Sequence, residues 1–144
     1  MSLTLETSLN GIAHALETRI APVLDDPFAC EAARLAVILT RISALAVNDA
    51  AAIRAEENAW LRTLFAEATA SVDDDLAIQL REAAASVDPS IRISDLDREN
   101  ARLRRVLIAL HGAVEARRDH AAKVIDGRIW QLLSDIEAAR APGI

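Results

Sequence analysis

Residues 28–88 read FACEAARLAVILTRISALAVNDAAAIRAEENAWLRTLFAEATASVDDDLAIQLREAAASVD, a run of 61 residues that contains no glycine and no proline. These two residues are the strongest interruptions of regular secondary structure. About one residue in five of the whole chain is alanine, the best intrinsic helix former. The run therefore predicts long helices and an all-α protein.

The composition of the 144-residue chain also favours a helical core. Hydrophobic residues make up 52% of the chain, but only 3% is aromatic and tyrosine is absent. A core of Leu, Ile, Val and Ala suits closely packed helices better than a sheet, because strands favour aromatic and β-branched residues. The length is that of one domain, so we predict a single helical-bundle domain over residues 1–144.

The charge and the single cysteine limit the classes of partner and compartment. A net charge of −6 and a pI near 5.0 argue against binding to nucleic acid or to an anionic membrane surface. Cys30 has no second cysteine to pair with, which fits a reducing compartment. The first residues lack the pattern of a secretory signal, and the apolar runs are far shorter than the roughly 20 residues of a membrane span. We expect a cytoplasmic protein that binds neither nucleic acid nor membrane.

Apolar residues that recur every three or four positions predict four helical segments. They cover about residues 3–23, 28–70, 71–87 and 95–139. The second segment keeps its phase past Asn48-Asp49, which favours one long helix; the alternative is a break there, with Asp49 capping a separate helix. In the last segment Gly112 and Gly127 mark either a close helix crossing or a break, and Asp126-Gly127 is the better candidate for a break.

These segments predict an antiparallel bundle of four to five helices, two of them long, with a frayed tail at about 140–144. Pro22 should end the first helix because it has no N–H for the helical hydrogen bond. Asp26 is a suitable N-cap, and Pro27 a suitable first residue, for the second helix. A continuous 28–70 helix would be roughly 60 Å long. Its shorter neighbours could not cover it, so we predict a homodimer in which the long helices pack across a two-fold axis.

A short motif occurs twice in the second half of the chain. Residues 57–62 read ENAWLR and residues 99–104 read ENARLR, so both match E-N-A-x-L-R at a spacing of 42. Six positions are too few to establish an internal duplication. The two readings left open are a true repeat and two helices that share one packing requirement.

Several charged residues fall within the apolar stripes of the predicted helices. Asp49 and Glu57 do so in the second helix, and Arg117, Arg118 and Arg128 do so in the last. An unpaired buried charge costs several kcal/mol, so the favoured interpretation is acid–arginine pairing between helices. The alternatives are a polar pocket in which the arginines bind an anionic ligand, and positions that face a partner chain or solvent.

Neither His111 nor a cluster of four arginines is interpreted as a binding site. His111 borders the last stripe, where a partly buried structural imidazole is favoured over a ligand. The cluster Arg98, Arg102, Arg104 and Arg105 is interleaved with acidic residues and lacks an aromatic platform, so we interpret it as a solvated helix face.

No constellation of residues predicts catalysis or metal binding. The Glu-x-x-His motif of di-iron bundles is absent, and a single cysteine gives no zinc set. The chain has no nucleophile elbow, P-loop or dinucleotide-binding glycine motif. Cys30 is interpreted as a small buried hydrophobe. We therefore name no catalytic residue, metal or cofactor, and lean against an enzyme.

The segment Pro22–Ala29, together with the two E-N-x-x-L-R motifs, resembles small bacterial all-helical proteins of unknown function. The resemblance extends over roughly residues 16–104. It implies a bacterial helical domain and transfers no activity and no functional residue.

The sequence thus favours a non-enzymatic helical interaction or accessory protein that acts as a homodimer or binds another helical protein. The alternative is a small anionic-ligand binder or enzyme with a charged pocket inside the bundle. The residues assigned to that pocket are Asp49, Glu57, Arg117, Arg118, Arg128 and His111.

Overall fold

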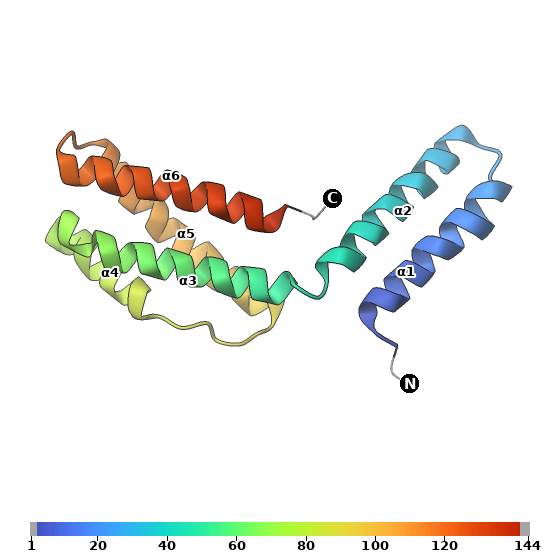
Figure 1. Ribbon diagram of the computed structural model, residues 1–144, viewed down its shortest axis with the longest axis horizontal. Helices are drawn as coiled ribbons and strands as arrows, with labels where there is room; N and C mark the ends of the chain where they lie inside the picture. Colours follow the sequence, from blue (N-terminus) through green and yellow to red (C-terminus); the bar gives the residue numbers. More distant parts are fainter. Residues whose placement is uncertain (1–2, 142–144) are drawn as a thin grey trace. The chain divides into compact units, whose positions relative to one another are not determined.

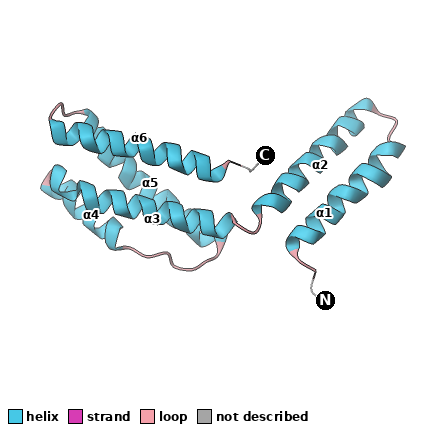
Figure 2. Cartoon of the chain, in the orientation of Figure 1, coloured by secondary structure: helices cyan, strands magenta, loops and turns pink. Residues whose placement is uncertain are grey.

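The computed structural model describes residues 3–141 and contains helices, turns and loops in that part of the chain (Figure 1, Figure 2). The prediction of an all-α protein is therefore confirmed. The chain divides into two compact units, of which the first reaches Ala50 and the second spans Ala51–Ala141. Whether they fold as the single domain predicted from the sequence stays a prediction.

The first unit is a helical hairpin. Helix α1 spans Leu5–Ala15 and continues into a π-helical turn, Leu16–Ile20, and a 3-10 turn, Ala21–Val23. The α-helix thus ends at Ala15, and the two irregular turns carry the chain on to Pro22, which has no N–H to continue the helical hydrogen bonds. Helix α2 spans Pro27–Ala46, and the Asp26 carboxylate caps it by accepting a hydrogen bond of 2.9 Å from the Ala29 N–H. The predicted start of this helix at Asp26-Pro27 is confirmed.

The predicted continuous helix over residues 28–70 is wrong. Residues 47–49 form a turn, and a separate helix α3 spans Ala50–Ala68. Within this turn the Asn48 side chain donates a hydrogen bond of 2.8 Å to Glu6 Oε2. Asn and Asp side chains offer such alternatives to helical hydrogen bonding, so apolar periodicity across the turn did not ensure continuity.

The second unit contains α3 and three further helices. Helix α4 spans Asp74–Ala85, α5 spans Ile93–Glu115 and α6 spans His120–Arg140. The last predicted helix is therefore divided in two. The break follows Glu115 and does not fall at Gly127. Asp119 marks the start of the new helix, because its carboxylate caps α6 by accepting a hydrogen bond from the Ala122 N–H. Adding a Cβ to Gly112 or Gly127 would meet no atom within 4 Å, so neither glycine marks a close crossing.

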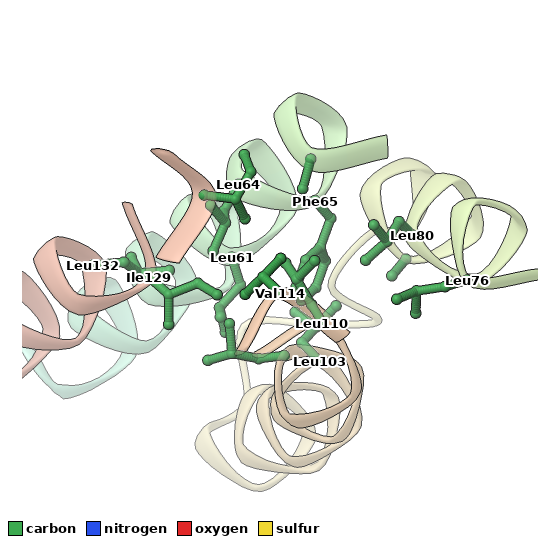
Figure 3. Close-up of a cluster of buried hydrophobic side chains, with 14 of the residues drawn as sticks. Leu61, Leu64, Phe65, Leu76, Leu80, Leu103, Leu110, Val114, Ile129 and Leu132 are labelled. Atoms are coloured by element: carbon green, nitrogen blue, oxygen red, sulfur yellow. The ribbon is translucent and has the colours of Figure 1, made fainter. Parts of the chain in front are cut away.

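Helices α3 and α5 run in one direction, and α4 and α6 run in the opposite direction (Figure 1). The second unit is thus an up-down-up-down arrangement of four helices. The described part of the chain contains six α-helices, so the predicted count of four to five is too low. Its core lies between the four helices (Figure 3). The fully buried large side chains in this core include Leu61, Phe65, Leu80, Leu103, Leu110 and Ile129.

Among the described residues, no single helix is both long enough and apolar enough to cross a membrane. The consecutive helices Pro27–Ala46 and Ala50–Ser71 meet that test of length and composition only when they are taken together across their break.

Candidate functional site

The two copies of the E-N-A-x-L-R motif meet in the interior of the second unit. Asn58 on α3 is fully buried and Asn100 on α5 is almost so. The Asn100 amide donates to Asn58 Oδ1 at 2.9 Å and to Glu57 Oε1 at 2.8 Å. The repeated motif therefore reflects a shared packing role, and the duplication hypothesis stays open.

The glutamates and arginines of the two motifs pair reciprocally. Glu57 on α3 binds Arg104 on α5 at 2.6 Å, and Glu99 on α5 binds Arg62 on α3 at 3.0 Å. In each motif the arginine follows the glutamate by five positions. This is the pattern of paired g and e positions in parallel coiled coils, where asparagine at a fixes the register. The two motif leucines, which would occupy d, are fully buried.

Further groups complete this buried polar network. Arg140 on α6 binds the second oxygen of Glu57 at 2.6 Å, and Arg102 binds Glu99 at 2.7 Å. Asp88, in the connection between α4 and α5, accepts hydrogen bonds from Asn58 and Arg62. Within residues 3–141 no buried side-chain nitrogen or oxygen lacks a hydrogen-bond partner. A fully satisfied network of this kind specifies helix pairing.

The arginines stabilise the ionised form of both buried glutamates. Hydrogen bonds from Arg102, Ser86 and Arg62 lower the pKa of Glu99 to about 2, although burial acts in the opposite direction. Burial raises the pKa of Glu57, but hydrogen bonds from Arg104, Asn100 and Arg140 outweigh it, so the net shift is downward. Both glutamates are therefore carboxylates at neutral pH.

The charged residues predicted from the apolar stripes lie in different places. Asp49 is exposed in the turn before α3. Arg117 and Arg118 are exposed in the loop between α5 and α6, where Arg117 binds Asp119 at 2.7 Å and also donates to the Ser71 carbonyl. The structure therefore does not assemble the two loop arginines around Glu57.

The other two predicted residues make pairs between helices. Arg128 on α6 binds Glu67 on α3 at 2.7 Å. His111 Nε2 lies 3.2 Å from Asp126 Oδ1, and its ring meets Trp130 edge-on with centroids 5.5 Å apart. Acid–arginine pairing between helices is thus confirmed for Glu57 and Arg128. Ligand binding by any of the six predicted residues stays a prediction.

The solvated-face interpretation of the arginine cluster is correct for Arg98 and Arg105 and wrong for Arg102 and Arg104. These two belong to the buried polar network. The sequence signal that could have identified them was the motif pair itself, because a repeated glutamate and arginine five residues apart predicts reciprocal pairing of parallel helices.

Two observations concern sites for small ligands. The described residues contain no group of three His, Cys, Asp or Glu side chains that could hold a metal ion. A surface groove beside α3 and α6 is lined by Trp60, Leu64, Arg128 and Asp135, among others. Arg128, the arginine of this groove, binds Glu67 at 2.7 Å.

The hairpin has a second feature, an apolar face of α2 that α1 does not cover. Against α1, α2 buries only the small side chains Ala33, Val37 and Ala44. On the opposite side of the helix, at 100° per residue, lie six large exposed side chains. This outer face of α2 consists of Phe28, Leu35, Ile38, Leu39, Ile42 and Leu45, with exposed fractions between 41% and 87%.

Comparisons with protein-family models, with curated proteins and with solved structures find no match for this chain.

Proposed function

We propose that this chain is a non-enzymatic helical interaction protein that acts as a homodimer through the outer face of α2. The observation that carries the proposal is the uncovered apolar surface of that face. Contiguous apolar surface of this size on a soluble protein typically marks an interaction site.

The exposed area agrees with what an interface requires. The six side chains leave about 700 Å² of mainly apolar surface uncovered, close to the roughly 800 Å² that each partner buries in a standard interface. A two-helix hairpin buries a smaller fraction of its surface than a larger domain does, so an additional partner surface would stabilise it. Pairing with a second copy would supply it.

The second unit supports the same class of function. Its most deeply buried charges, Glu57 and Glu99, are bound by arginines of the same chain. This arrangement is typical of register-fixing ion pairs rather than of groups that bind substrate. The second unit is therefore interpreted as a structural bundle.

Native mass spectrometry and light scattering of the full chain test the proposal. We expect twice the 15.5 kDa chain mass at micromolar concentration. The double variant Leu35→Lys/Ile42→Lys should be monomeric with unchanged helix content, because a charge in the centre of an apolar interface is expensive to desolvate.

Ile108→Lys is the matched control. Ile108 is 72% exposed on α5, so it is an equally apolar surface residue outside the outer face of α2. It should leave the dimer mass unchanged. A monomeric wild-type chain, or a dimer that persists in the Leu35→Lys/Ile42→Lys variant, would contradict the proposal.

A further inference from the structure

We infer that the two copies pair antiparallel along α2, with the N-terminal end of each α2 against the C-terminal end of the other. This inference rests on the proposed function, because it specifies how the second copy sits on the outer face of α2. It is carried by the order of apolar and charged residues along that face.

The outer face follows a heptad pattern. Phe28, Leu35 and Ile42 are spaced by seven residues, and so are positions 31, 38 and 45, each of which lies three residues after a member of the first series. These two series correspond to the a and d positions of a coiled coil. Five of the six positions are residues of the outer face, and the sixth is Glu31, an exposed glutamate near the start of the helix. Leu39, the remaining residue of the outer face, directly follows Ile38 and so takes the flanking e position.

A parallel dimer would place each a or d residue against the same residue of the other copy. The two Glu31 carboxylates would then face each other within an apolar contact, and like charges in register are destabilising. The two Phe28 rings would also meet at one end. The parallel arrangement therefore puts the one charged position of the series in its least favourable environment.

An antiparallel dimer instead places a positions against d positions. Phe28 then meets Leu45 of the second copy, Leu35 meets Ile38, and both ends of α2 are matched. Glu31 lies opposite Ile42 and hence next to Arg41 of the second copy, which can neutralise it. Charged residues that flank an apolar seam set helix orientation in this way.

The present partners of these charges do not oppose this rearrangement. Glu31 binds Arg34 at 2.7 Å with both side chains about 70% exposed. Arg41 binds Glu17 on the hairpin at 2.5 Å with both side chains about half exposed. Exposed pairs of this kind contribute little to stability, so Glu31 and Arg41 can exchange or share partners when a second copy docks.

Disulfide trapping distinguishes the two orientations. The background is Cys30→Ser in the full chain, which removes the single native thiol but keeps a hydrogen-bond donor toward the Leu24 carbonyl. Two variants are made in it, Leu45→Cys alone and Phe28→Cys/Leu45→Cys. Positions 28 and 45 lie roughly 25 Å apart along one helix, so a bond between them must join two chains.

Under mild oxidation the Phe28→Cys/Leu45→Cys variant should give a covalent dimer joined between positions 28 and 45, identified by peptide mass mapping. The Leu45→Cys variant should give no more covalent dimer than the control Ile78→Cys, whose site is a half-exposed position on α4. A 45–45 bond in Leu45→Cys, in a chain that is dimeric by native mass spectrometry, would overturn the antiparallel arrangement and leave the proposed function intact.

A monomeric chain by native mass spectrometry would overturn the proposed function itself. The proposed function would also be overturned if the chain sedimented as a monomer with phosphatidylcholine vesicles, because lipid would then occupy the outer face of α2. Each of these outcomes is distinct from a trapped dimer of the wrong orientation.

Discussion

The substitution Glu57→Gln tests the buried polar network most directly. Glu57 is 1% exposed, and its two oxygens accept hydrogen bonds from Arg104, Arg140 and Asn100. Glutamine keeps an oxygen for Asn100, but its NH₂ group meets one arginine as donor against donor. The change therefore removes the charge that both arginines bind without leaving a cavity.

The expected loss of stability follows from these contacts. A hydrogen bond to a charged group contributes about 1.5–3 kcal/mol. The side chains of Arg104 and Arg140 are 38% and 46% exposed, so water can partly replace the lost carboxylate. Two such partners at the low end of the range give a decrease of about 3 kcal/mol in the free energy of unfolding.

Urea unfolding followed by tryptophan fluorescence measures this change selectively. The only two tryptophans, Trp60 and Trp130, both lie in the second unit. The matched control is Glu137→Gln, an exposed glutamate on α6, which should change stability by less than about 0.5 kcal/mol. If Glu57→Gln unfolds at the same urea concentration as the control, the network does not stabilise the bundle and the reasoning is refuted.

Three further results are expected. Because the pKa of Glu99 is about 2 in the folded chain and near 4.5 when unfolded, its stabilisation is present above about pH 5 and is lost as pH falls toward 2. That loss is about 3 kcal/mol by linkage, and acid titrations of the unfolding midpoint should be visibly flatter for Glu99→Gln. Gly112→Ala and Gly127→Ala should each increase the free energy of unfolding by about 0.5–1 kcal/mol, since each added Cβ enters open space on a helix. The thermal midpoint should therefore rise, and a lower midpoint would contradict this. Phe65→Ala should cost about 3–5 kcal/mol in urea unfolding because its ring is completely buried in the core, and a cost below 1 kcal/mol would contradict the described packing.

Local sequence features predicted the helices well where capping chemistry and periodicity agreed. Asp26-Pro27 defined the start of α2 because both residues act on the first turn alone. The same features failed at the two internal breaks. Periodicity continued through Asn48-Asp49, and the loop at residues 116–119 contains no glycine or proline. At the first break the Asn48 side chain bonds to Glu6, and at the second Arg117 donates to the Ser71 carbonyl, so residues far apart in the chain compensate for lost helical hydrogen bonds. The second break also has a local cap, Asp119.

The candidate site was predictable only in part. Glu57 was singled out because a carboxylate in an apolar stripe requires a partner. Its partners could not be assigned, because Arg104 is 47 and Arg140 83 residues further along the chain. The two E-N-A-x-L-R motifs could have identified Arg104 as a partner, but they predict reciprocal glutamate–arginine pairing only if α3 and α5 run parallel. The α4 helix and the extended connection after it produce that direction.

The sequence by itself determined that this protein is helical, where α2 begins, and that Glu57 needs a cation. Those properties depend on backbone hydrogen bonding, capping and desolvation, which act over a few residues. The tertiary structure decided which arginines bind Glu57 and Glu99, and which apolar side chains remain uncovered. Both depend on how helices far apart in the chain pack, and many packings satisfy the same local pattern. The apolar stripe of α2 is therefore visible in the sequence, whereas its exposure is a property of the fold.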